Sequence, residues 1–334
     1  MNTNPTLYDV AREAGVSLAT ASRALNGSSR VVKDEYRERV ERAAARLGYT
    51  PNLSAQAVAK GASTTVALLV SDIADPYFSA IAKGVIRAAD AQGLAVTMAV
   101  TERDSERELG LVRMLRGQRP RAIVLAGSRF VDEADRATLV AELDSFVGTG
   151  GRVAFISQTE LPFDTVSIDN RGGAAALARE LVELGYRGFA ILAGPENLVT
   201  ARDRVDAFVA ALPAPPLAIV HGDFSRDAGY EGMLELIDAG LPDIDVVFAV
   251  NDVMATGALA ALRDRGIAVP EGIAVAGFDD ISLASDVTPS LTTVHVDLES
   301  AGAAAVSLTL GTSSVPAVTM VGATVVVRAS TPRR

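Results

Sequence analysis

Short apolar runs alternate with helix-like segments from residue 64 almost to the C-terminus. Eight runs predict strands, and they are VALLV at 66, LAVTMAV at 94, AIVLA at 122, VAFIS at 153, FAILA at 189, LAIV at 217, VVFAV at 246 and IAVAGF at 273. Helix-like segments between them include 77–91, 107–116, 172–184, 202–212, 226–239 and 254–265. Near-continuous apolar strands alternating with helices are typical of parallel sheets covered on both faces. The strands are too many for one ordinary sheet, so we expect two doubly wound α/β subdomains.

Short polar side chains follow several of these predicted strands. In parallel sheets, ligands bind beyond the carboxyl ends of the strands, and two facing subdomains place the site in the cleft between them. Asp75, Asn251 and Asp279 each closely follow an apolar run, and Ser157 ends another. We therefore expect these four side chains at a cleft.

An arginine and three aromatic residues complete the expected pocket. Arg204 offers a planar fork of donors that suits paired hydroxyls or a carboxylate. Tyr77, Phe78 and Phe224 can supply aromatic faces for the apolar side of a sugar ring. Carboxylates, an amide, an arginine and aromatic rings together predict a site for a neutral polyol.

Ordinary structural roles remain open for some of the same residues. Asp75 and Pro76 are compatible with a plain turn before a helix, and Arg204 with a surface ion pair. Asp252 is a candidate helix N-cap and Phe278 a candidate core residue. We favour a site for Arg204 and Asp279, and ordinary roles for Asp252 and Asp280.

Residues 7–26, LYDVAREAGVSLATASRALN, predict two short helices joined by a tight turn. Thr6 and Asp9 form a candidate capping box, Gly15 supplies the turn, and Ser17 caps the second helix. A third amphipathic helix, about 33–47, places Tyr36, Val40, Ala43 and Leu47 on one stripe. The three helices together predict an all-α helix-turn-helix unit. The first two helices alone are also compatible with an ordinary helical hairpin.

The first 61 residues resemble the DNA-binding headpiece of the lac-repressor (LacI/GalR) family of transcriptional regulators. The matching segments are TLYDVAREAGVS, SLATASRALNG, RLGY and the PN at 51–52 that opens the hinge helix of the family. The resemblance implies that Leu18, Ala19 and Arg23 face base edges, with Arg23 suited to a guanine. It also implies a DNA-binding set of Leu7, Tyr8, Ser17, Thr20, Ser22, Asn26, Tyr49, Asn52, Ala55 and Val58.

The same resemblance predicts a hinge helix over about 52–60 that folds on operator DNA. There it pairs with its dimer mate and wedges an apolar side chain into the minor groove, which unstacks and kinks the duplex. Val58 stands at the usual leucine position. Because valine is shorter, we expect a shallower wedge and a weaker kink.

Residues 62–330 are similar to the periplasmic sugar-binding-protein fold that the same family uses as its effector sensor. The markers are DPYF at 75, VSIDNRGG at 166, GYRGFAILAGP at 185, ARDRVDAF at 201, VNDVMATGA at 250, VAGFDD at 275 and PSLTTVHVD at 289. The family crosses between subdomains three times, which implies a first subdomain of about 62–162 and 293–322 and a second of about 163–292 and 323–330. Asp206 and Val296 depart from the residues that relatives often carry there.

Charge separates the two parts of the chain. Residues 1–60 hold nine Lys or Arg against six Asp or Glu, whereas the remainder holds 22 against 35. A basic head on an acidic body fits phosphate contact by the head alone.

The sequence has no cysteine, which excludes disulfides, a thiolate nucleophile and cysteine-bound metal clusters.

Enzyme motifs are missing from the sequence. There is no GxxxxGK[ST], HExxH or GxSxG, and His221 and His295 lie far apart. We therefore expect neither catalysis nor a cofactor or metal. A polar N-terminus and the lack of a long apolar segment predict a cytoplasmic protein without a membrane partner.

These observations together predict a homodimeric repressor that a small sugar-like effector releases from a roughly palindromic double-stranded operator. The chain ends at TPRR, with no room for an added tetramerising helix, which favours a dimer. A corepressor-dependent repressor or a dual regulator is the alternative within this class. A solute-binding protein without a regulatory role would share the body. However, it would need a signal peptide and would have no reason to carry the headpiece.

Overall fold

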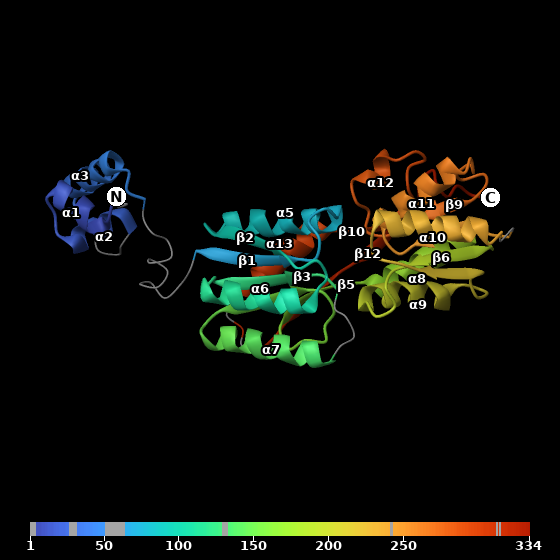
Figure 1. Cartoon of the computed structure of the whole chain (residues 1–334), viewed down its shortest axis with the longest axis horizontal. Coiled ribbons are helices and arrows are strands. Elements are labelled where there is room, and N and C mark those ends of the chain that lie inside the picture. Colours follow the sequence, from blue (N-terminus) through green and yellow to red (C-terminus); the bar gives the residue numbers. More distant parts are fainter. Residues whose placement is uncertain are drawn as a thin grey trace. The chain divides into compact units, whose positions relative to one another are not determined.

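Figure 1 shows the computed structural model of the chain, which describes residues 5–26, 32–50, 64–128, 133–240, 243–311, 313 and 315–334. The chain divides into two compact units. The small N-terminal unit is here called the headpiece, and the large unit, which begins at Thr65, is called the body. No helix among the described residues has the length and apolar character that a membrane span requires.

Over its described residues, 5–26 and 32–50, the headpiece contains three helices, α1 (Leu7–Ala14), α2 (Leu18–Asn26) and α3 (Asp34–Leu47). The predicted capping box is confirmed, because the Asp9 amide donates to the Thr6 hydroxyl while the Asp9 carboxylate accepts from the Thr6 amide. Gly15 has a φ of 63°, in the left-handed region that favours glycine, and so allows the sharp exit from α1. The predicted Ser17 cap is also present, with the Thr20 amide 3.1 Å from Ser17 Oγ.

Small side chains from all three helices form the headpiece core. Its buried members are Val10, Ala11, Ala14, Ala21, Val40, Ala43 and Ala44. The prediction that Tyr36 shares this stripe is wrong, because the side chain is 37% exposed and lies beside the Arg39 guanidinium. Ala44, one turn from Val40, is buried instead, since a small residue lets the helices approach closely.

The first lobe of the body is built on a six-stranded parallel sheet of order β11-β5-β4-β3-β1-β2. Its strands are β1 (Thr65–Val70), β2 (Ala95–Val100), β3 (Ala122–Ala126), β4 (Arg152–Ile156), β5 (Asp164–Ile168) and β11 (Val318–Val321). Its helices are α5 (Pro76–Asp90), α6 (Ser105–Gly117), α7 (Glu133–Gly148) and α13 (Leu298–Leu310). Helices α5 and α13 cover one face of this sheet, and α6 and α7 cover the other (Figure 1).

Strand β1 shows why both faces are apolar. Val66, Leu68 and Val70 point into the core beneath α5 and α13, whereas Ala67 and Leu69 point into the core beneath α6 and α7. Successive side chains of a strand face opposite sides, so a strand covered twice needs a continuous apolar run. The sequence pattern that predicted the parallel sheet therefore has this direct cause.

The second lobe is built on a four-stranded parallel sheet of order β7-β6-β8-β9. Its strands are β6 (Phe189–Ala193), β7 (Ala218–His221), β8 (Val246–Ala249) and β9 (Ala274–Ala276). Its helices are α8 (Asn170–Glu183), α9 (Val199–Ala211), α10 (Arg226–Asp238), α11 (Asp252–Asp264) and the short α12 (Leu283–Asp286). In Figure 1, α8 and α9 lie on one side of the sheet and α10 and α11 on the other.

A small antiparallel sheet of β10 (Thr293–Val296) and β12 (Ala323–Val326) accompanies the second lobe. Isolated parallel bridges pair Ala276 with Thr292 and Asp279 with His295, so β10 runs beside the segment that follows β9. Between β10 and β12 the chain forms α13 and β11 of the first lobe. Because β5 also belongs to the first sheet, that sheet extends beyond residue 162, where the sequence places the first crossing.

Candidate functional site

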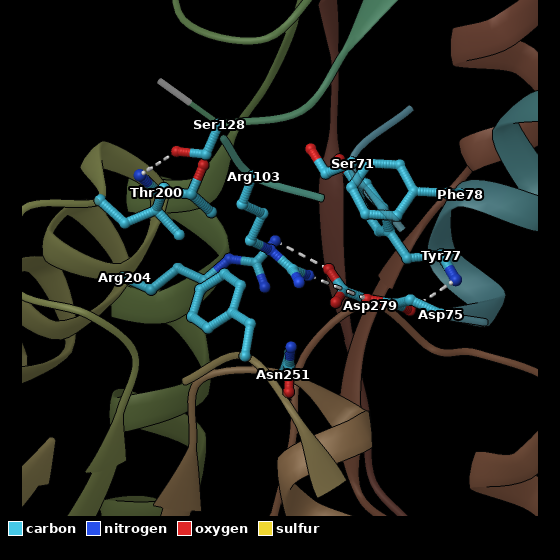
Figure 2. Close-up of a pocket in the computed structure, with 12 residues that line it drawn as sticks. Ser71, Asp75, Tyr77, Phe78, Arg103, Ser128, Thr200, Arg204, Asn251 and Asp279 are labelled. Atoms are coloured by element: carbon cyan, nitrogen blue, oxygen red, sulfur yellow. Dashed lines mark hydrogen bonds and ion pairs between the residues drawn. The ribbon is translucent and has the colours of Figure 1, made fainter. Parts of the chain in front are cut away.

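A pocket of about 430 Å³, including its open mouth, lies between the two lobes (Figure 2). The first lobe contributes Ser71, Asp75, Tyr77, Phe78, Arg103 and Ser128. The second lobe contributes Leu198, Thr200, Arg204, Phe224, Asn251 and Asp279. All of these residues lie beyond the carboxyl ends of parallel strands, in the loops or in the first turns of the helices that follow.

Two of the lining residues also cap helices with their side chains. Asp75 accepts from the Tyr77 amide at 2.9 Å and caps α5, which begins with Pro76. Asn251 accepts from the Met254 amide at 2.8 Å and caps α11. For Asp75, the ordinary role at a helix start and the site therefore coincide. Each cap uses one side-chain oxygen and leaves the rest of the polar group near the pocket.

Arg204 is buried in the pocket floor and is not part of a surface ion pair. Its Nε donates to Asn170 Oδ1 at 2.8 Å, its Nη1 to the Val250 carbonyl at 2.8 Å, and its Nη2 to Asp279 Oδ1 at 2.7 Å. Its guanidinium also lies 3.8 Å above the ring of Phe278. These contacts join α9 to the residues that follow three strands, and they fix the position of the guanidinium in the pocket floor.

Burial shifts the ionisation of the acidic groups in the pocket. Desolvation raises the pKa of Asp279 to about 6, although Arg204 opposes the shift. Burial also raises the pKa of Asp75 and of the Tyr77 hydroxyl. Two aspartates and two arginines, Arg103 and Arg204, give the lining no formal net charge when all four are ionised. Such a pocket favours a neutral ligand over an anion or a cation.

Seven of the eight predicted effector residues are brought together in this pocket, and they are Asp75, Tyr77, Phe78, Arg204, Phe224, Asn251 and Asp279. Ser157 lies outside the lining set, because its hydroxyl is turned toward the Gly127 carbonyl at 2.7 Å and Gln158 Oε1 at 2.8 Å. Phe278 is a core residue, as its alternative role required. The role of the seven lining residues in binding an effector stays a prediction.

Sequence reasoning missed five lining residues, which are Ser71, Arg103, Ser128, Leu198 and Thr200. Ser71 and Ser128 follow the apolar runs at 66 and 122 almost directly. The strand-end rule that selected Asp75 would have found both. Leu198 and Thr200 carry no comparable signal, because their position depends on how α9 begins.

The neighbouring acidic residues have structural partners outside the pocket. Asp280 accepts from Arg328 at 2.7 Å and lies 2.9 Å from His295 Nδ1. Asp252 is buried and accepts from the Thr293 hydroxyl at 2.6 Å, and burial raises its pKa well above the usual value. Asp252 does not cap α11, because Asn251 does so.

The remaining sequence candidates of the body lie elsewhere. His221 Nδ1 is 3.1 Å from the Gly194 carbonyl oxygen, and Val296 is buried in the main core. Asp206 is exposed on α9, and nothing in the structure explains its departure from relatives. The described residues hold no group of three or more His, Cys, Asp or Glu side chains placed to bind a metal ion.

The outer side of α2 is the candidate DNA-contacting face of the headpiece. Leu18, Ala19 and Arg23 are exposed there, as predicted, whereas Ser22 and Thr20 are half-buried. Arg23 has no ion pair with a described residue. An exposed guanidinium beside two apolar side chains can approach a duplex, and among the described residues it has no salt bridge to lose.

Other predicted DNA-binding residues are distributed around this face or fall outside the structure described. Tyr8 is 64% exposed on α1, and Leu7 and Tyr49 are half-buried against the headpiece core. The hinge at 52–60, with Asn52, Ala55 and Val58, lies outside the described residues, as does the side chain of Asn26.

Comparisons with known proteins match both parts of the chain. Residues 6–52 match the model of bacterial regulatory proteins of the lacI family, and residues 178–331 match a periplasmic binding protein-like domain. The HTH-type transcriptional regulator CelR of Thermobifida fusca is 35% identical over 308 residues, which cover 89% of this chain and 88% of CelR. The chain belongs to the LacI family.

Solved structures of LacI-family members agree over the whole length. The lac repressor dimer bound to operator and the anti-inducer ONPF has a TM-score of 0.86 at 29% identity, covering 99% of this chain and 100% of that one. The CelR–cellobiose complex has a TM-score of 0.70 at 31% identity, covering 98% and 99%. The predicted helix-turn-helix headpiece and the two parallel-sheet lobes are therefore confirmed as the LacI-family architecture.

Proposed function

We propose that this LacI-family chain is a homodimeric transcriptional repressor, released from a near-palindromic operator by a small neutral sugar or related polyol. The observation that carries the proposal is the pocket, in which Asp75 and Arg103 of the first lobe and Arg204, Asn251 and Asp279 of the second converge at balanced charge. Such a site can donate to and accept from several hydroxyls at once, and Phe224 offers an aromatic face. The CelR structure that resembles this chain is a cellobiose complex.

The headpiece supports the DNA-binding half of the proposal. Its second helix exposes Leu18, Ala19 and Arg23 on one face, and two such helices related by a dimer axis would read two half-sites. The lac repressor structure that resembles the chain is a dimer bound to operator. A regulator of chromosomal DNA acts in the cytoplasm, which we propose as its location. Neither His221 nor His295 lines the pocket, so we propose no catalytic role for the pocket.

The sign of regulation is open to an alternative, in which the small molecule acts as a corepressor or the protein is a dual regulator that also activates at some sites. The effector can shift the equilibrium only by its differential affinity for the DNA-binding and free states. We propose the inducer sign. The fold permits either sign.

Operator binding with and without candidate sugars tests the proposal. An operator can be selected with the full-length chain from a pool of random duplexes, and a panel of neutral sugars, nucleosides and phosphorylated sugars can be screened by thermal shift. A ligand that binds the folded state raises the melting temperature. We expect neutral sugars to do so and then to weaken operator binding in fluorescence anisotropy.

Each other result has a defined meaning. Stronger operator binding in the presence of the sugar would establish the corepressor sign. Stabilisation by phosphorylated sugars alone would contradict the neutral-polyol site. A chain that selects no operator at all would contradict the repressor function.

A further inference from the structure

Hydrogen bonds join the two lobes directly at one side of the pocket. The Thr200 amide of the second lobe donates to Ser128 Oγ of the first at 3.0 Å (Figure 2). Gln158 Nε2, also from the first lobe, donates to Thr200 Oγ1 at 2.7 Å and lies 3.4 Å from Ser128 Oγ. Two side chains from loops of the first lobe and one from the first turn of α9 therefore meet across the cleft.

The beginning of α9 explains why Thr200 needs a partner. The N-cap residue of α9 is Leu198, whose side chain cannot accept a hydrogen bond. The first amides of a helix have no intrahelical acceptor, and an N-cap side chain normally accepts from the second or third of them. Thr200 is the second residue of α9, and Ser128 of the other lobe accepts from its amide. The first lobe thus supplies the cap that the second lobe lacks.

Ser157 and Gly127 hold Gln158 from its own lobe. Strands β3 and β4 are parallel neighbours, so the residues that follow them lie side by side. The Ser157 hydroxyl lies 2.8 Å from Gln158 Oε1 and 2.7 Å from the Gly127 carbonyl oxygen. One end of the Gln158 amide is thereby fixed in the first lobe while the other reaches Thr200.

We propose that Ser128 and Gln158 form a latch that holds the lobes closed by capping α9 from the first lobe. Opening the cleft would leave the Thr200 amide without its acceptor and break the Gln158 bond. Ser128 of the latch and its partner Thr200 also line the pocket, so lobe closure fixes the hydroxyl groups of both residues at the ligand site. Gln158 acts through them as a positioning residue. As a statement about effector regulation, the inference rests on the proposed function, but the latch itself can be tested without effector or operator.

A distance measurement between the lobes tests the latch in the full-length chain. Because the sequence has no cysteine, E106C on α6 and E231C on α10, both exposed, can be spin-labelled selectively. We expect one narrow distance distribution by double electron–electron resonance. S128A and Q158A should each add a population at a different distance, and T200V should do the same from the other lobe.

Matched variants separate the latch from a local structural effect. T200S keeps the hydroxyl, and Q92A removes an exposed glutamine of the first lobe outside the cleft, so both should retain the starting distribution. The double variant Q158A/T200V should shift no further than either single variant. Unchanged distributions in S128A, Q158A and T200V, or additive shifts in the double variant, would overturn the proposal. Because no effector or DNA is present, neither outcome depends on the proposed regulatory function.

Discussion

Nη2 of Arg204 donates to Oδ1 of Asp279 at 2.7 Å, with the two side chains only 2% and 6% exposed. The pair joins α9 to the segment that follows β9, beneath the pocket. A buried ion pair contributes little to stability over an apolar replacement, but removing one partner leaves a charge without compensation. The pair therefore fixes the shape of the pocket floor at the risk of a large loss when it is broken.

Replacing Arg204 by methionine should destabilise the body strongly. Three hydrogen-bond acceptors, Asn170, Val250 and Asp279, would lose their donor in a buried site. We expect a loss of about 3–5 kcal/mol in the free energy of unfolding, measured by urea denaturation at neutral pH. The control is R171M, which removes the exposed pair with Asp203 and should cost less than about 1 kcal/mol. Equal losses in both variants would contradict this account.

The stability conferred by Asp279 should depend on pH with a definite sign. Its pKa is raised from 3.8 to about 6 by burial, so between these values the folded protein retains a proton that the unfolded chain releases. Stability from this group is therefore present at low pH and is lost as pH rises through about 6. Wild type should lose stability relative to D279N from about pH 4 to about pH 7, and the difference should then stay constant. Urea denaturation across this range checks the trend, and a wild type that gained stability relative to D279N as pH rose would refute it.

Apolar runs predicted the strands best where both faces of the strand are covered. β3 and β6 match their predicted runs because every side chain in them is buried. β11 gave no such signal, since Val318 and Met320 are more than half exposed on an edge strand. An edge strand with one open face does not need a continuous apolar sequence.

The pocket was predictable to the extent that it follows from strand ends. Asp75, Asn251 and Asp279 are polar residues placed by the ends of buried strands, and the topology alone brings such residues together. Thr200 could not be found in this way. Its contact with Ser128 forms only because the two lobes approach each other. The two residues are far apart in the sequence, so no local sequence pattern predicts the contact.

The contact between α5 and α13 depends on glycine. A Cβ added at Gly84 would lie 2.0 Å from the Glu299 carbonyl oxygen, so G84A must push the two helix backbones apart. We expect a loss of roughly 1–3 kcal/mol or more in the free energy of unfolding. At Gly110, in α6, an added Cβ would meet no described atom within 4 Å beyond its own stretch of helix, and G110A should stabilise by roughly 0.5–1 kcal/mol through helix propensity. Thermal denaturation of both variants tests this contact. A loss of stability in G84A together with a gain in G110A would support it, whereas similar losses in both variants would contradict it.

Arg23 should carry sequence information, whereas other headpiece arginines should not. It is exposed on the outer face of α2 beside Leu18 and Ala19, which have no hydrogen-bonding side chains to read a base. R23A should weaken binding to the selected operator by about 1–3 kcal/mol and relax the preference at one position of each half-site, because a bidentate contact with guanine is lost. R12A, on α1, breaks the exposed pair with Asp9, the one ion pair that Arg12 makes with a described residue, and should leave the consensus unchanged. Anisotropy titrations against the selected operator and its single-base variants distinguish these effects. A uniform weakening on all sequences by R23A would instead assign Arg23 to a phosphate, and base recognition would then rest on shape alone.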